Sequence, residues 1–213
     1  DDDEVDDMPV PILFGISVAS LWSNFGDPRD GGDREHEGLD IMAPEGAYIV
    51  SPTDAVVTRT GKGSSAGTYV YTANPGGETF VYMHLDKIGE GVTSGVVLEQ
   101  GSLIGYVGNT GNASGGAAHL HFEIHSGSRN PVDPYPRLTG EFSLAEKVSY
   151  LSRILDVASD KTALSQLLVA NFRSTFTSAF NANVALPTSI TDAMLANPVS
   201  TSPDQRAVPV SLP

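Results

Sequence analysis

The sequence contains no cysteine. Disulfide bonds and thiolate metal ligands are therefore excluded, and a metal site in this chain must be built from histidine, aspartate or glutamate. The chain also lacks a Gly-x-Ser-x-Gly segment, the turn that carries the nucleophilic serine of many hydrolases. The sequence therefore gives no support for hydrolysis by a cysteine nucleophile or by a serine in a Gly-x-Ser-x-Gly turn.

Basic residues are scarce: 12 Lys and Arg stand against 26 Asp and Glu, which gives a formal net charge of -14. A chain this acidic repels the phosphates of DNA and RNA, so no nucleic-acid partner is expected. Six of the first seven residues are acidic, and we expect residues 1–9 to form a solvated N-terminal arm. The alternative for this arm is a regulatory tail that covers a cationic site.

Long apolar runs are missing as well. The longest, residues 10–22, is interrupted by Pro11, Gly15, Ser17 and Ser20 and is too short to cross a bilayer, so no membrane span is expected. The chain begins without Met and without a charged and then apolar signal segment. We therefore expect it to be a processed or excerpted part of a longer protein.

Turn residues, by contrast, are abundant, with 22 Gly and 14 Pro. Over residues 10–137 they separate short runs rich in β-branched and aromatic residues, which predicts a mainly β domain with an antiparallel sheet, arranged as a sandwich or a curled sheet. The predicted strands are residues 48–50, 55–59, 68–72, 80–84, 103–107 and 119–125.

Helical periodicity begins only after residue 137. Two apolar stripes recur at three- and four-residue intervals there: Leu144, Val148, Leu151 and Leu155, and then Leu164, Leu168, Phe172, Phe176 and Phe180. Residues 138–196 are predicted to form a helical appendage, a two-helix hairpin that starts at a capping box of Ser143 and Glu146. The stripes pack on each other or on the β domain, or they dock to a partner protein. Residues 197–213, rich in Pro, Ser and Thr, are expected to form an extended tail.

All five histidines fall in the β-rich part, and they are grouped. His36 and Asp40 lie four residues apart around Gly38, in a segment that favours a loop entering a strand. His119 and His121 belong to a strictly alternating segment, residues 119–125, which is typical of a strand and places both imidazoles on one face. His125 lies roughly 13 Å from His121 along an ideal strand, so we expect it to be an exposed or groove-edge residue and not a ligand of the same metal.

Two imidazoles and one carboxylate around a metal leave a position open for water, as in catalytic zinc sites. Such an ion activates water for attack on a carbonyl near neutral pH, and a neighbouring histidine can act as base or stabilise the oxyanion. The strand pattern alone leaves open whether His119 or His121 binds the metal.

The motifs resemble those of the LytM/lysostaphin-type zinc metallopeptidases, the peptidoglycan endopeptidase family. The matching segments are residues 36–41 (His-Glu-Gly-Leu-Asp-Ile), 82–85 (Tyr-Met-His-Leu), 108–111 (Gly-Asn-Thr-Gly) and 119–123 (His-Leu-His-Phe-Glu). The resemblance covers about residues 20–134 and implies a LytM-type peptidase domain with one Zn2+ per chain. It further implies that His36, Asp40 and His121 bind the zinc, while His84 and His119 flank the metal-bound water and are catalytic.

The same resemblance implies that the chain hydrolyses peptide cross-links of bacterial peptidoglycan, by attack of a metal-bound water. It places this activity outside the cytoplasm, in the periplasm, in the cell wall or as a secreted protein. Two alternatives remain: a phage virion or tail component with the same chemistry, and a non-catalytic regulator of other wall hydrolases. Trp22, Tyr69 and Tyr71 are candidates for the walls of a substrate groove, although core packing is the expected role of each.

Overall fold

The computed structural model describes residues 5–197. Residues 1–4 of the predicted arm and residues 198–213 of the predicted tail lie outside the described residues. The chain divides into two compact units, Asp1–Lys147 and Val148–Pro213, and the first contains all five histidines. The predicted domain boundaries remain predictions.

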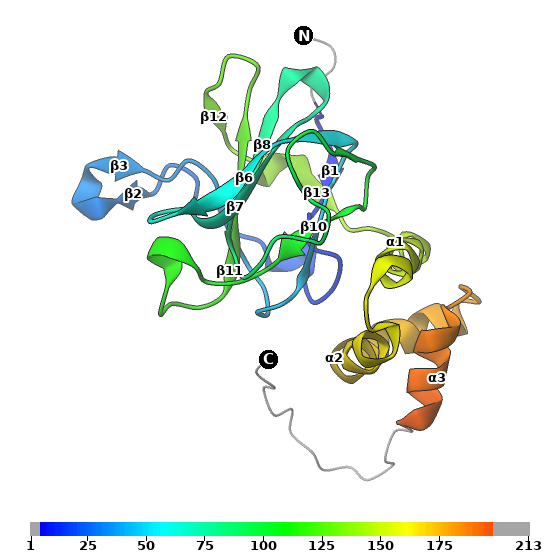
Figure 1. Cartoon of the computed structure of the whole chain (residues 1–213). Helices are drawn as coiled ribbons and strands as arrows, with labels where there is room; N and C mark the ends of the chain where they lie inside the picture. Colours follow the sequence, from blue (N-terminus) through cyan, green and yellow to red (C-terminus); the bar gives the residue numbers. More distant parts are fainter. Residues whose placement is uncertain (1–4, 198–213) are drawn as a thin grey trace. The chain divides into compact units, whose positions relative to one another are not determined.

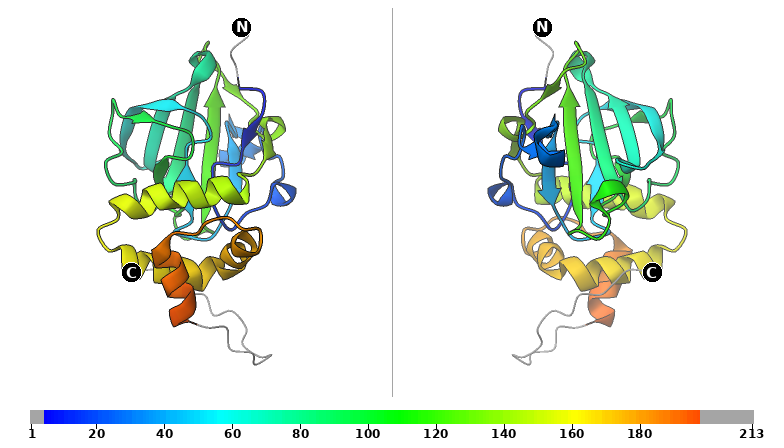
Figure 2. Two further views of the ribbon diagram at one scale, coloured as in Figure 1. Left: turned by 90° about the vertical axis from the view of Figure 1, so that its right-hand side faces the viewer. Right: turned by 90° about the vertical axis from the view of Figure 1, so that its left-hand side faces the viewer.

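The first unit is built on a seven-stranded main sheet whose neighbouring strands are antiparallel (Figure 1). In sheet order the strands are β12 (Pro131–Val132), β11 (His119–His125), β8 (Thr79–Leu85), β7 (Gly67–Ala73), β6 (Ala55–Gly63) and β9 (Val97–Leu98), and β4 (Leu39–Met42) also pairs with β11. Figure 2 shows the long strands of this sheet side by side. The predicted mainly β, antiparallel fold is confirmed.

Three small sheets and several short helical turns complete this unit. The sheets pair β5 (Tyr48–Val50) with β10 (Leu103–Tyr106), β2 (Pro28–Arg29) with β3 (Arg34–Glu35), and β1 (Met8–Pro9) with β13 (Leu138–Gly140). The 3-10 turns are Val18–Ser20, Asp30–Gly32, Pro75–Gly77, Gly111–Ala113 and Tyr135–Arg137. Met8 and Pro9, the end of the predicted arm, therefore belong to a strand, and the predicted strand at residues 103–107 ends at Tyr106.

The two faces of the main sheet differ sharply, as the alternating sequence of β11 predicts. Leu120, Phe122 and Ile124 are fully buried in the hydrophobic core on one face. Val70 and Tyr82, from β7 and β8, join the same core. Because side chains alternate along a strand, His119, His121 and Glu123 lie on the other face, which is called the histidine face below.

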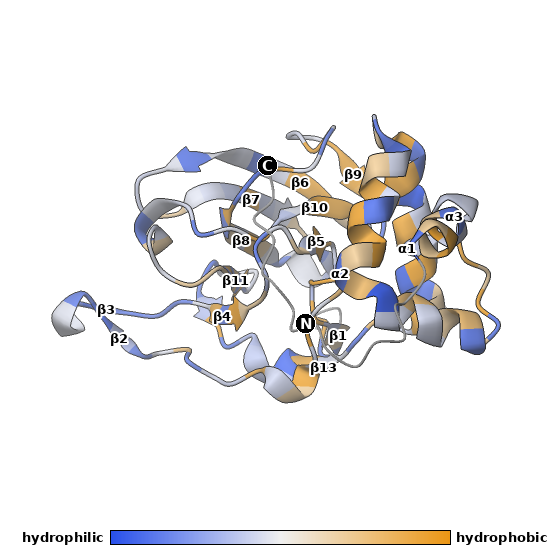
Figure 3. Ribbon diagram, turned by 90° about the horizontal axis from the view of Figure 1, so that it is seen from below, coloured by the Kyte–Doolittle hydropathy of each residue, from blue (hydrophilic) through white to orange (hydrophobic). Residues whose placement is uncertain are grey.

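The second part of the chain is helical, with α1 (Leu144–Val157), α2 (Lys161–Asn181) and α3 (Thr188–Ala196). The predicted capping box at the start of α1 is confirmed: the Ser143 amide donates to Glu146 Oε2 at 2.8 Å, and the Glu146 amide donates to Ser143 Oγ at 3.3 Å. Figure 3 shows apolar and polar residues alternating along these helices. Among residues 5–197, no helix combines the length and apolarity needed to cross a membrane.

The predicted two-helix hairpin is incomplete because α3 forms a third helix. This helix has only nine residues and buries only Ile190 and Ala193, so its sequence carries too short a stripe to show periodicity. The stripe along α2 is also broken. At Phe172 the backbone leaves helical geometry (φ -127°, ψ 28°), and beyond it Phe176 is buried while Phe180 is 63% exposed.

Candidate active site and metal centre

The pairing of β4 with β11 brings the first two predicted metal ligands together. Asp40 stands directly opposite His121 in this antiparallel pair, as Met42 does opposite His119. Directly opposed residues share a face of the sheet, and their Cβ atoms lie about 5 Å apart. The Asp40 carboxylate and the His121 imidazole therefore meet on the histidine face.

The loop before β4 supplies His36, and Gly38 lets this loop lie against β11. A Cβ atom on Gly38 would lie 2.5 Å from the Phe122 carbonyl oxygen and 2.9 Å from His121 Nε2, closer than real contacts allow. Only glycine fits this approach. The resulting bend places His36 Nε2 3.0 Å from Asp40 Oδ1, the convergence that the spacing of the two residues predicted.

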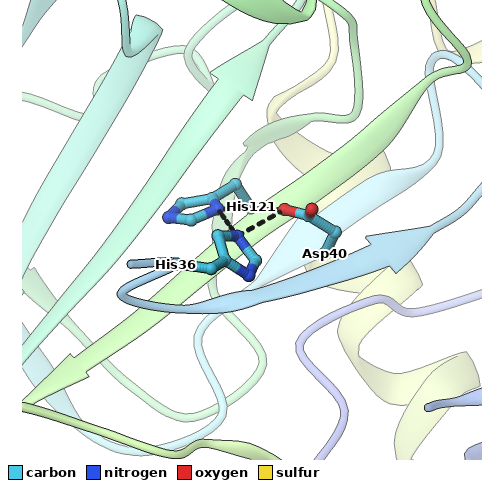
Figure 4. Close-up of side chains that lie close together, drawn as sticks. All are labelled: His36, Asp40 and His121. Carbon is cyan, nitrogen blue, oxygen red and sulfur yellow. Dashed lines mark hydrogen bonds and ion pairs between the residues drawn. The ribbon is translucent and has the colours of Figure 1, made fainter. Parts of the chain in front are cut away.

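Three atoms of these residues form a nearly equilateral triangle (Figure 4). His36 Nε2, Asp40 Oδ1 and His121 Nδ1 are separated by 2.9–3.0 Å. His36 and His121 are buried, and the three residues form a group that could hold a metal ion.

Neighbouring acceptors fix the tautomers of both imidazoles in this triangle. His36 Nδ1 lies 2.8 Å from the Asn24 carbonyl, and His121 Nε2 lies 2.8 Å from a Glu123 carboxylate oxygen. Carbonyls and carboxylates accept hydrogen bonds, so each of these nitrogens carries the proton and, in the neutral ring, the other nitrogen presents a lone pair to the triangle. Three lone-pair donors directed at one another match the coordination of a cation, and partners of this kind orient metal-binding histidines in many proteins. The residues therefore fit a metal ion.

The second oxygen of Asp40 is held away from the triangle. Asp40 Oδ2 accepts hydrogen bonds from Asn24 Nδ2 at 3.0 Å and from Arg29 at 2.8 Å. Burial alone would raise the pKa of Asp40, but in the absence of a metal ion its contacts with His121 and His36 hold that pKa well below its usual range. The carboxylate is thus ionised, and Oδ1 is the oxygen that faces the two histidines.

Glu123 extends this network to His125, and the sequence analysis assigned neither residue to the site. The two oxygens of Glu123 accept hydrogen bonds from His121 and from His125 Nε2, both at 2.8 Å. Burial alone would raise the pKa of Glu123, but these bonds lower it to about 2. Burial alone would lower the pKa of His121, but its bonds to Asp40 and Glu123 raise it to about 9. The alternation of residues 119–125 already places all four polar residues on one face and is the signal that could have linked them.

His84 reaches the histidine face through an irregularity in β8. Between Tyr82 and Leu85, which are both core residues, β8 carries Met83 and His84, whereas the facing segment of β7 carries only Tyr69. This extra residue is a β-bulge, and His84 adopts the left-handed conformation with φ 63°. A regular strand would turn His84 toward the same side as Tyr82; the bulge instead brings its ring to within 5.1 Å of the His119 ring and 5.7 Å of the His121 ring, centroid to centroid.

His84 and His119 also have defined tautomers. His84 Nδ1 donates to the Thr110 carbonyl and His119 Nδ1 to the Ala117 carbonyl, each at 2.9 Å. The Nε2 atoms are left as the lone-pair positions of the neutral rings. Burial, with the neighbouring His119 and His121, lowers the pKa of His84 to about 4, so this ring is neutral near pH 7. His119 Nε2 lies 3.8 Å from Asp40 Oδ1, at the edge of the triangle.

Comparisons with known proteins relate the histidine-containing segment to a known family. The model of peptidase family M23 matches residues 34–134, the segment that contains all five histidines. The chain is 32% identical to the L-Ala–D-Glu endopeptidase of Bacillus subtilis over 140 residues. This aligned segment covers 62% of the present chain and 42% of the relative. It is 31% identical over 150 residues to the peptidoglycan DD-endopeptidase ShyC of Vibrio cholerae, which covers 68% of this chain and 33% of the relative.

A solved structure shares the fold: a zinc-containing peptidase from Vibrio cholerae, with a TM-score of 0.50 and 26% identity over 66% of this chain and 41% of that chain. The chain spans less than half the length of these relatives. Residues 34–134 thus match peptidase family M23, and this segment is similar to the endopeptidase relatives named above.

Proposed function

We propose that this chain is a zinc-dependent endopeptidase that hydrolyses peptide cross-links of bacterial peptidoglycan outside the cytoplasm. The observation that carries the proposal is the triangle of His36 Nε2, Asp40 Oδ1 and His121 Nδ1, whose lone pairs converge and whose tautomers are fixed by neighbouring acceptors. The named relatives support the substrate, since two are endopeptidases and one of these is a peptidoglycan DD-endopeptidase.

In this proposal His36, Asp40 and His121 hold the zinc ion. When bound, zinc would supply Lewis-acid chemistry, lowering the pKa of water and polarising the scissile carbonyl. The chain contributes an ionised Asp40 with one oxygen directed to the site, and Glu123 accepts the Nε2 proton of His121, which keeps the Nδ1 lone pair directed to the site. The two histidines are thereby held in one orientation before the ion arrives.

His84 and His119 are proposed as the catalytic histidines beside that centre. Each donates its Nδ1 proton to a backbone carbonyl and keeps the Nε2 lone pair. A neutral ring can accept a proton from the attacking water at Nε2, and a protonated ring can donate to the carbonyl oxygen as it gains negative charge. The low pKa of His84 favours the neutral form at the start of the reaction.

The test is the release of new amines and peptide fragments from purified cross-linked peptidoglycan. Zinc-loaded protein should cut, whereas chelator-treated protein and the zinc-treated variants His121→Ala and Asp40→Asn should not. Asp86→Asn is the matched control, because Asp86 is exposed and lies outside the site. If the zinc-loaded wild type binds the ion but leaves walls of both stem-peptide and glycine-bridge type intact, the proposed activity is wrong. The comparisons do not favour the non-catalytic or virion-associated alternatives, and nothing supports a protein partner for the helices.

A further inference from the structure

The histidine face continues past the histidines across the main sheet. Arg59 on β6 stands opposite Tyr71 on β7, Tyr71 stands opposite Val81 on β8, and Val81 stands opposite Glu123 on β11. Directly opposed residues of an antiparallel sheet share a face. Arg59 and Tyr71 therefore lie on the face that carries His121.

Two tyrosines form a fixed aromatic surface on this face. Tyr69 and Tyr71 are half-buried, and their rings meet edge to face at 5.4 Å. Val70, between them, points into the core, so neither tyrosine has the core role expected from the sequence. Gly61 stands opposite Tyr69, and a Cβ atom there would lie 2.7 Å from the tyrosine hydroxyl. The glycine leaves the space in which this side chain lies across β6.

The Arg59 guanidinium stacks on both rings. Its Cζ atom lies 4.2 Å from the centroid of Tyr71 and 5.2 Å from that of Tyr69. Stacking uses the flat face of the guanidinium and leaves N–H groups at its edge for an anion. Arg59 is exposed, and in the described part of the chain no carboxylate forms an ion pair with it, whereas Arg29 and Arg34 are each paired. In a chain of net charge -14, this cation therefore has no carboxylate within ion-pair distance among the described residues.

We propose that Arg59, Tyr69 and Tyr71 form a subsite that binds a carboxylate of the substrate peptide. The inference rests on the proposed endopeptidase function and names a feature of its substrate. Arg59 lies three strand spacings of about 4.8 Å across the sheet from the strand that carries His121, with an offset of two residues along the strands. Because the arginine side chain is long, its guanidinium can lie about 10–13 Å from His121. The bound carboxylate therefore belongs to a residue three or four positions from the scissile bond, at about 3.3 Å per extended residue.

A peptide carboxylate is the occupant favoured by charge and shape. The guanidinium offers paired N–H donors that match a carboxylate, and the tyrosines offer an apolar surface to the backbone and side chains next to it. The carboxylate can be that of a residue within the peptide or that of its C-terminus.

The experiment compares three versions of a peptide that the zinc-loaded wild type cleaves: with all carboxylates free, with the internal carboxylate converted to a carboxamide, and with the C-terminus amidated. Wild type, Arg59→Gln and Lys62→Gln are compared on each. Lys62 is the matched control, because it is an exposed cation on the same strand whose side chain alternates to the other face. Arg59→Gln should raise KM on the free peptide by about three- to tenfold with little change in kcat, as expected for a partly exposed charged contact.

Amidation of the bound carboxylate should raise the KM of the wild type by the same factor and abolish the difference between wild type and Arg59→Gln. The amidated peptide that has this effect shows whether the internal or the C-terminal carboxylate binds to the subsite. The proposal is overturned if Arg59→Gln behaves as Lys62→Gln does, or if its loss is equal on all three peptides. If the wild type cleaves no peptide, the proposed function fails separately, and the Kd values of the same peptides for zinc-loaded protein test the subsite. Equal Kd values for wild type and Arg59→Gln on the free peptide would then overturn it.

Discussion

Replacing Gly38 with alanine should weaken metal binding although residue 38 is not a ligand. The new Cβ atom would lie 2.5 Å from the Phe122 carbonyl oxygen and 2.9 Å from both Glu123 Cγ and His121 Nε2, where ordinary contact begins at 3.4 Å. The loop must therefore retreat from β11 by roughly 0.5–0.9 Å. Metal sites tolerate ligand displacements of only about 0.2 Å, and His36 lies on this loop. We expect the affinity for zinc to fall on the order of a hundredfold.

The assay is competition for zinc against a chromophoric chelator near neutral pH. Gly140→Ala is the matched control, because a Cβ atom on Gly140 meets nothing within 4 Å. Unfolding of the chelator-treated proteins shows separately whether Gly38→Ala still folds. A folded Gly38→Ala protein that binds zinc as tightly as the wild type would refute the claim that this close approach positions His36.

Further predictions concern the surroundings of the site and the core. Glu123→Gln keeps the shape but loses the charge beside His121, so zinc affinity in the same competition assay should fall about 10- to 100-fold; unchanged affinity would contradict a supporting role. In chelator-treated protein, His121 has a pKa of about 9, whereas an unperturbed histidine has a pKa of 6.5. The contribution of His121 to stability should therefore be present below pH 6.5 and lost as the pH rises through 9. Urea unfolding across this range should show the decline in the wild type and not in His121→Ala. His84→Gly should be about 1 kcal/mol more stable than His84→Ala, because alanine keeps the strain of φ 63°; equal stability would argue against that strain. Arg137 forms two hydrogen bonds with the buried carboxylate of Glu78. Glu78→Ala removes this ion pair and should lower the free energy of unfolding by about 3–5 kcal/mol, whereas a loss below about 1 kcal/mol would mean that water replaces the carboxylate.

The parts of the fold that follow a simple period could be predicted from the sequence. Residues 119–125 alternate strictly, and the observed strand has the predicted bounds, with Leu120 and Phe122 in the core. The convergence of His36 with Asp40 followed from the turn residues between them. Neither step needed knowledge of distant contacts, because alternation and turns are local properties of the chain.

The position of His84 could not be predicted in this way. Period-two alternation from the core residue Tyr82 places His84 on the core side, and only the resemblance to a known family assigned it to the site. The bulge that redirects it depends on how β8 pairs with β7, a contact between separate segments. The three-residue interval between Tyr82 and Leu85, both buried, is the local sign that the alternation fails there.

The residues that hold Asp40 and His36 in place could not be predicted for a similar reason. The Asn24 side chain and carbonyl reach Asp40 and His36 across 12 or more residues, and Arg29 reaches Asp40 from the β2–β3 hairpin. No periodicity or spacing in the sequence predicts such contacts. They become visible only when the loop, the hairpin and β4 are placed together.

The bulge in β8 makes the site sensitive to the length of the strand more than to the type of each residue in it. Tyr82 and Leu85 must both return to the core, so the number of residues between them is fixed, while Met83 is only partly buried and can vary. In a collection of related chains, insertions and deletions should therefore be absent from this interval. They should gather at positions such as the tip of the β2–β3 hairpin, where Gly31 and Gly32 border open space.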